Sequence, residues 1–325
     1  MLAFILRRLA QAVAVMLVVG LIAFSLFRFV GDPVTFMLGQ DATPEQRIEV
    51  THLLGLDRPF YVQYLNFLGQ AVQGEFGLSL RQVQPVSRLI GERLPATLEL
   101  SFVAAFFALA AGIPMGVYTA LRPKSWLTQF LLAVSLAGVS LPTFLIGILL
   151  ILVFSVQLGW LPSFGRGDTV TLGWWTTGFL TASGLKALIL PSITLGLFQM
   201  TLIQRLVRSE MLEVLRTDYI RFARARGLTD RAVHFGHALK NTLVPVITIT
   251  GLQLGAIIAF AIITETVFQW PGMGLMLIQA VQNADIPVMA AYLMLVAFMF
   301  VFINFVVDLI YVRVDPRIRI FGRSS

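Results

Sequence analysis

Few residues of this chain are of a type that carries out chemistry. Cysteine is absent from its 325 residues, which excludes thiol nucleophiles, disulfides and Cys-ligated metals. His234 and His237 are three residues apart, so both imidazoles fall on one helical face, the spacing of half a metal site. Because no third ligand lies nearby, the pair favours a solvated helix surface over a metal centre. No combination of Ser, His and Asp at a shared depth is evident, so the sequence predicts neither a catalytic centre nor a metal site.

The lysines argue against a nucleotide site of the Walker type. That motif places a glycine directly before its lysine, whereas Lys124, Lys186 and Lys240 each follow a proline or a leucine. The chain is therefore not expected to hydrolyse ATP by that route.

The acidic residues argue against an ion-coupled carrier. Such carriers normally expose acids or histidines at mid-membrane depth. Glu99, Glu265 and Asp308 are the acids within or beside apolar segments, and each is expected near a helix end. Helix capping or solvation at the membrane interface is the simpler role there. A stand-alone secondary carrier is thus the weaker interpretation.

Neutral polar residues within apolar segments are Gln199, Gln204, Gln253 and Asn304. Side chains of this kind can line a path for a polar solute or form hydrogen bonds between helices. Both roles stay open, and Gln199, Gln253 and Asn304 are the candidates for a translocation path.

The elements that would position these residues are membrane spans. Hydrophobic residues make up 57% of the chain and charged residues 13%, which predicts an all-α integral membrane protein. A span needs about 20 apolar residues. Six such runs occur, at residues 9–30, 96–121, 130–158, 187–206, 243–263 and 288–311.

A basic stretch, residues 205–245, sets the expected orientation. It holds eight of the 24 Lys and Arg residues, and basic loops between spans face the cytoplasm. This orientation puts 16 of the 24 Lys and Arg residues on the cytoplasmic side. Both termini lie on that side as well, because the number of spans is even. Since the positive charges gather beside apolar segments, the lipid bilayer is the expected partner and nucleic acid is not.

Within this stretch, the pattern predicts two helices separated by a glycine. Gly227 follows an Ala- and Arg-rich helical run, and Thr229 and Asp230 supply an N-cap for a second run. Residues 205–245 should therefore form a compact element that docks onto something in the cytoplasm.

The chain is expected to divide into four parts. Residues 1–30 contain the cytoplasmic N-terminus and the first span. Residues 31–95 carry five basic and seven acidic residues and are predicted to form a small extracytoplasmic domain. Residues 96–312 form a five-span core that includes the basic stretch, and residues 313–325 form a cytoplasmic tail.

Ordered strings along the whole chain resemble a known family, the B-type permease subunit of bacterial dipeptide and oligopeptide ABC importers, which includes nickel and glutathione systems. The strings are FILRRL (4–9), GDPV (31–34), GLDRPFYVQY (55–64), ERLPATLEL (92–100), LGWLPSFG (158–165), LEVLRTDYIRFARARGLTDRAVHFGHALKNTLVPVIT (212–248), TETVFQWPGMG (264–274) and VDLIYVRVDPRIR (307–319).

The resemblance implies a type I ABC importer fold, also called MetI-like, in the bacterial inner membrane. It implies a second homologous permease, two cytoplasmic ABC ATPase subunits and an extracytoplasmic solute-binding protein as partners. ATP and Mg²⁺ would then be bound by the ATPases, and no cofactor is expected in this chain. Peptides are the expected solute, with a nickel chelate, glutathione or another small solute as the alternative. The 31–95 domain would guide the binding protein or gate the solute chamber.

The family's cytoplasmic loop usually carries the motif E-A-A-x-x-x-G, followed by a helix that inserts into the ATPase. Here the matching positions read Arg221-Phe222-Ala223 and Gly227, so the acid and the first alanine are replaced. The following helix would cover about residues 228–241. The resemblance thus implies a set of docking and coupling residues, namely Arg221, Ala223, Gly227, Leu228, Thr229, Asp230, Arg231, His234, His237, Lys240 and Asn241.

Overall fold

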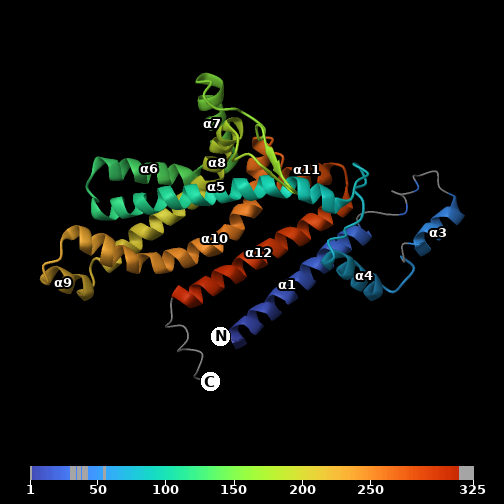
Figure 1. Ribbon diagram of the computed structural model, residues 1–325, viewed down its shortest axis with the longest axis horizontal. Coiled ribbons are helices and arrows are strands. Elements are labelled where there is room, and N and C mark those ends of the chain that lie inside the picture. The colour runs from blue at the N-terminus through green and yellow to red at the C-terminus, as the bar shows by residue number, and fades with distance from the viewer. Residues whose placement is uncertain (1, 30–33, 35–37, 39–42, 54–55, 315–325) are drawn as a thin grey trace. The chain divides into compact units, whose positions relative to one another are not determined.

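The computed structural model describes residues 2–29, 34, 38, 43–53 and 56–314, and the chain there is almost entirely helical (Figure 1). The predicted tail beyond residue 314 and most of residues 30–42 lie outside the described residues. The elements in chain order are α1 (Leu2–Phe29), α3 (Pro44–Leu53), α4 (Phe60–Val72), α5 (Val86–Leu121), α6 (Trp126–Ser140), α7 (Thr143–Leu150), the π-helix η1 (Ile151–Gln157), β1 (Val170–Leu172), β2 (Trp175–Thr177), α8 (Ala182–Val214), α9 (Asp218–Ala225), the π-helix η2 (Ala232–Ala238), α10 (Leu239–Val267), α11 (Met273–Gln282) and α12 (Ile286–Val314).

The described helices include four that are long and apolar enough to cross a membrane, at residues 5–26, 86–121, 182–214 and 286–309. Two bent helix pairs provide up to two more spans. One pair joins α6 to α7 and η1 with a bend of 117°, and the other lies within α10, where the axis bends by 49° between residues 251 and 255. This agrees with the six expected spans.

The span expected over residues 130–158 is broken into two helical parts. Leu141 has an extended backbone, with φ −90° and ψ 137°, and separates α6 from α7. Pro142 explains the break, because its ring disfavours helical geometry in the residue before it and it has no N–H to donate.

The chain forms two compact units. Unit 1 contains Met1–Pro95, Thr171–Thr176 and Pro271–Phe302, and unit 2 contains Ala96–Val170, Thr177–Trp270 and Ile303–Ser325. The expected domain boundary at residue 95 lies inside α5, which begins at Val86.

In unit 1, α1 packs on α4 through aromatic rings. Phe24 contacts the rings of Phe60, Tyr64 and Phe67 at centroid distances of 5.1, 5.8 and 5.7 Å. The Tyr64 hydroxyl donates to the Leu17 carbonyl at 2.6 Å, and burial raises the pKa of this phenol. Helix α4 is therefore attached to the first span, α1.

Asp285, at the start of α12, organises the other end of unit 1. Its carboxylate accepts hydrogen bonds from the Ser79 hydroxyl at 2.5 Å, the Leu80 amide at 3.2 Å and the Arg81 amide at 3.5 Å. The segment before α5 is thereby fixed to the turn between α11 and α12.

In unit 2, α5 and α8 pack closely because small residues recur every four positions along α5. They are the buried residues Ala104, Ala108, Gly112, Gly116 and Ala120. A Cβ atom added at Gly116 would lie 2.6 Å from Val207 Cβ and 2.8 Å from the Gln204 carbonyl oxygen. Stripes of small residues of this kind let helix backbones approach in membranes, where packing rather than hydrophobic burial drives association.

Candidate functional site: a helical element at the end of unit 2

The basic stretch 205–245 is helical rather than a loop. The end of α8, the two-turn helix α9, the π-helix η2 and the start of α10 make it up, with α9 beyond the end of α8 (Figure 1). The predicted helix, glycine and helix are confirmed. The second helix does not stop near Asn241, because η2 continues directly into α10, which ends at Val267.

Gly227 ends α9 in a left-handed conformation, with φ +80°. Its amide donates to the Arg224 carbonyl at 2.9 Å, and the Leu228 amide donates to the Ala223 carbonyl at 3.4 Å. These two bonds form a Schellman motif, which satisfies the last carbonyls of the helix. Thr229 then accepts a bond from the Ala232 amide at 3.4 Å through its hydroxyl, so its predicted capping role is confirmed.

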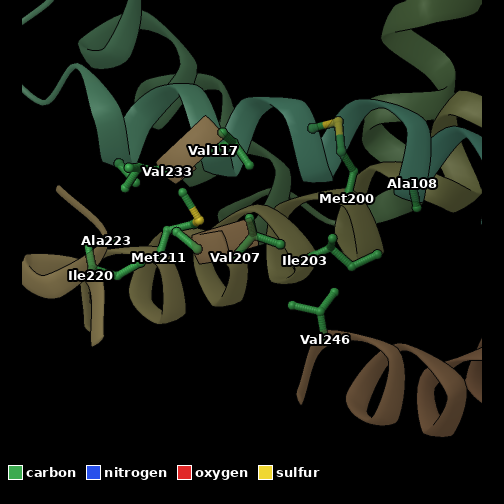
Figure 2. Packing of buried hydrophobic residues seen from close by; sticks show 12 residues of the cluster. Ala108, Val117, Met200, Ile203, Val207, Met211, Ile220, Ala223, Val233 and Val246 are labelled. Carbon is green, nitrogen blue, oxygen red and sulfur yellow. The ribbon is translucent and has the colours of Figure 1, made fainter. Parts of the chain in front are cut away.

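One face of α9 is anchored in the core of unit 2. Ile220 and Ala223 are buried in a cluster that contains Met211 from α8, Val117 from α5 and Val233 from η2. Figure 2 shows Ile220 and Ala223 beside Met211 at the end of α8. Ala223 therefore packs inside the chain and is not positioned to contact a partner.

The opposite face of α9, the turn after it and η2 expose apolar side chains. Phe222 is 64% exposed, and Tyr219, Leu228 and Phe235 are also exposed. Six basic residues of the same stretch, which we call its basic rim, are exposed as well: Arg216, Arg221, Arg224, Arg226, Arg231 and Lys240. We refer to the four apolar residues and this rim as the basic–aromatic surface. In the sequence, Phe222 stands where the family motif has its first alanine, and its position two residues after Ile220 already places it on the other face of a helix.

Contacts within the surface hold its aromatic and basic groups in place. Arg226 lies over the Phe222 ring, 5.9 Å from the centroid. Arg221 pairs with Asp218 at 3.1 Å, but both side chains are exposed, and such pairs contribute at most about 1 kcal/mol. The residue that stands in place of the usual acid therefore makes a weak local ion pair.

The two histidines differ in their surroundings. The His237 ring nitrogen Nδ1 lies 2.6 Å from the Tyr219 hydroxyl, which joins η2 to α9. His234 is half-buried on the same π-helix. Among the described residues, no group of three His, Asp or Glu side chains is arranged to hold a metal ion. His237 thus takes part in the contact between α9 and η2.

The candidate path residues lie in different environments. Gln204 is fully buried and accepts a hydrogen bond from Ser135 on α6, so it serves helix packing. Gln199 is also buried, and its Oε1 atom has no hydrogen-bond partner among the described residues. Gln253 and Asn304 are half-buried on α10 and α12.

The predicted solvated role of Glu99 and Glu265 is wrong, because both are buried, at 2% and 0% exposure. Glu99 Oε2 accepts from Arg166 Nη2 at 2.6 Å and from the Gly178 amide at 3.3 Å. The Thr97 hydroxyl donates to Glu265 Oε1 at 2.6 Å. These side chains, Thr97, Glu99, Arg166 and Glu265, form what we call the Glu99 cluster, at the opposite end of α5 from α9.

Sequence reasoning missed Arg166, although one signal was present. It is the single basic residue between Gly159 and Leu185, in a segment that is rich in glycine and has Asp168 as its one acid. A lone arginine in such a segment needs a carboxylate when it is buried, and Glu99 is the acid early in the preceding long helix.

The fold resembles that of a solved transporter. A chain in the inward-facing MetNI methionine ABC transporter superposes with a TM-score of 0.55 at 22% sequence identity, covering 70% of this chain and 96% of that one. At this level of identity the match shows the fold, which is the MetI-like permease fold.

Sequence comparison gives the family. A family described as "Binding-protein-dependent transport system inner membrane component" matches residues 112–320, and its N-terminal counterpart matches residues 1–101. The di/tripeptide transport system permease DppB of Pseudomonas aeruginosa is 44% identical, covering 98% of this chain and 99% of the relative. The dipeptide permease DppB of Escherichia coli K12 is 40% identical over the same shares. The chain therefore belongs to the inner-membrane permease components of binding-protein-dependent ABC importers, and it is a multi-pass membrane protein.

Proposed function

We propose that this chain is the permease subunit of an importer for di- and tripeptides. The observation that carries this is the 44% identity, across 98% of the chain, to a permease named for di/tripeptide transport. The chain would form the translocation path with a second homologous permease, and half-buried Gln253 and Asn304 are the side chains we place on it. A solute-binding protein would deliver the peptide from the extracytoplasmic side.

The orientation in the membrane follows from the charges. The basic–aromatic surface and Arg7, Arg8, Arg122 and Lys124 would face the cytoplasm, together with both termini. Residues 31–95 would then lie on the outside. The ionic attraction of these residues to the inner leaflet supports the same orientation.

The basic–aromatic surface is the site that we assign to the ATPase subunits. Its exposed Phe222 fits a small apolar pocket, and its rim of arginines fits an acidic border. Because α9 is anchored through Ile220 and Ala223, a push on Phe222 would reach the core of unit 2. The Tyr219 and His237 contact, and the unbroken run from η2 into α10, would carry that movement onward.

The function can be tested with the whole complex. We would co-express this chain with its partner permease and ATPases, purify it through a tag on this chain, and reconstitute it with the binding protein. Two ATPase chains should co-purify, and a labelled dipeptide should accumulate only with ATP and binding protein. Accumulation of glutathione or a nickel chelate instead would contradict the proposed solute, and uptake by this chain alone would contradict the ATP-driven mechanism.

Gly227 offers a prediction about coupling. A valine there is forced into a left-handed conformation that costs about 1–2 kcal/mol, although no atom lies within 4 Å of the added Cβ. We expect Gly227→Val to insert normally but to lower solute-stimulated ATPase activity in proteoliposomes, because α9 changes its angle to η2. Gly236→Val is the matched control, since Gly236 also has open space but has an ordinary φ. Equal activities of the two variants would refute this role of the Gly227 turn.

A further inference from the structure

The Glu99 cluster is a buried network that joins three segments of unit 2 far apart in sequence. Through Glu99, α5 binds both sides of the segment between Gly159 and Thr181: Arg166 lies before the β1–β2 hairpin and Gly178 after it. Through Thr97, α5 also binds Glu265 on the last turns of α10.

Backbone bonds around the cluster connect the same three segments. Trp270 is fully buried and donates its indole N–H to the Ala96 carbonyl at 3.0 Å. The Gly165 amide donates to the Phe268 carbonyl at 2.9 Å. An apolar core that includes Leu100, Leu188 and Ile257 packs beside them, so the network is closed to water on that side.

Burial of the Glu99–Arg166 ion pair requires explanation, because removing its two charges from water is unfavourable in free energy. The Arg166 and Glu99 side chains are only 7% and 1% exposed. Removing two charges from water costs several kcal/mol for each ion, and well-packed apolar residues often stabilise a fold as well or better. Stability alone therefore does not account for the pair, whereas its directional bonds fix one geometry between α5 and the loop.

The position of the cluster relates it to the transport cycle. The helix that contains Glu265, α10, follows directly on η2, which belongs to the assigned ATPase-docking element, and its axis bends by 49° between residues 251 and 255. Movement of that element would arrive at the other end of α10, at Glu265, and pass from there to α5 and the loop. If α10, α5 and the loop were free to move separately at this end, the movement of α10 would not be transmitted to the other two.

We propose that Glu99 and Arg166, with Thr97 and Glu265, are positioning residues for transport. They brace α5, the last turns of α10 and the loop around Arg166 and Gly178 into one rigid piece within unit 2, so that each ATP-driven movement displaces all three together. This inference rests on the proposed function as an ATP-driven importer. Without these contacts, ATP hydrolysis continues but is uncoupled from import of the solute.

The test measures ATP hydrolysed per dipeptide imported in proteoliposomes that hold the whole complex and binding protein. A single change such as Glu99→Gln weakens the pair and risks misfolding, so the decisive variant is Glu99→Leu with Arg166→Met, which removes both charges of the pair together and keeps the Thr97–Glu265 hydrogen bond. We expect it to assemble in normal yield but to raise the ratio about threefold or more. Arg166→Lys, which keeps the charge, should stay close to wild type. A wild-type ratio in the assembled double variant would overturn the proposal.

A second measurement does not depend on which solute is carried. The chain has no native cysteine, so Phe102→Cys on α5 and Phe164→Cys in the loop, both exposed, can receive spin labels. The distance between the labels should be the same without nucleotide and with trapped ATP, and should broaden in the double variant. A change of this distance on ATP binding in the otherwise wild-type chain would refute the brace. If wild type imports no dipeptide while this distance stays fixed, the proposed solute fails and the brace stands.

Discussion

Gly116→Val is expected to abolish assembly of a folded permease. The added Cβ alone would come within 2.6 Å of Val207 Cβ and 2.8 Å of the Gln204 carbonyl oxygen. A backbone oxygen cannot rotate away, so α5 and α8 must separate, and the contacts along the Ala104 to Ala120 stripe weaken together. Overpacking of this kind costs about 1–3 kcal/mol or more, and adjacent close contacts at Gly112 increase the loss.

Gly91→Val is the matched control for this experiment. Gly91 lies on the same helix, and no atom is found within 4 Å of a Cβ added there. Size-exclusion profiles of the fluorescently tagged chains in detergent, recorded after heating at stepped temperatures, should show a monodisperse peak for Gly91→Val and aggregate for Gly116→Val. Profiles that match for the two variants would show that α5 and α8 do not pack through this stripe.

Phe222→Asp is expected to prevent stable binding of the ATPase subunits while the permease stays folded. The side chain is 64% exposed on α9 and supports no part of the core, so the change acts on the surface alone. An aromatic residue at the centre of an interface typically contributes 2 kcal/mol or more, which corresponds to roughly 30-fold weaker binding. The acid also introduces a negative charge where we expect an acidic border on the partner.

The measurement is the amount of ATPase retained on the tagged permease during washing. Phe222→Leu should retain most of it, because an apolar side chain of similar volume remains. Tyr61→Asp is the matched control, since it also replaces an exposed aromatic residue, 65% exposed on α4 in unit 1, by an acid. This variant should retain all of the ATPase. Full retention by Phe222→Asp would exclude this residue as the contact.

The helical elements were largely predictable from the sequence. Apolar runs of span length, the glycine at 227 and the cap at Thr229 act locally, within one or two helical turns, and each was found where expected. The break at Pro142 was also encoded locally. Its size, a bend of 117°, was not, because the apolar run continues through the proline and periodicity does not report backbone direction.

The candidate site was predictable in position but not in detail. Ala223 and Phe222 are neighbours in a helix, and which of them faces outward depends on what packs against α9. Met211 and Val233 decide this, and they come from two other elements. Residues that looked equivalent in the sequence therefore divide into an anchored face and an exposed face.

The sequence by itself determined that this protein crosses the membrane several times, that its basic stretch forms a helical element, and that it lacks an ATP site of the Walker type. These properties depend on composition and on short-range pattern. Only the tertiary structure decided that Glu99 meets Arg166 across 67 positions and that Glu265 meets Thr97 across 168. Helix packing brings these pairs together, and the cost of burying a charge then requires that each partner be present.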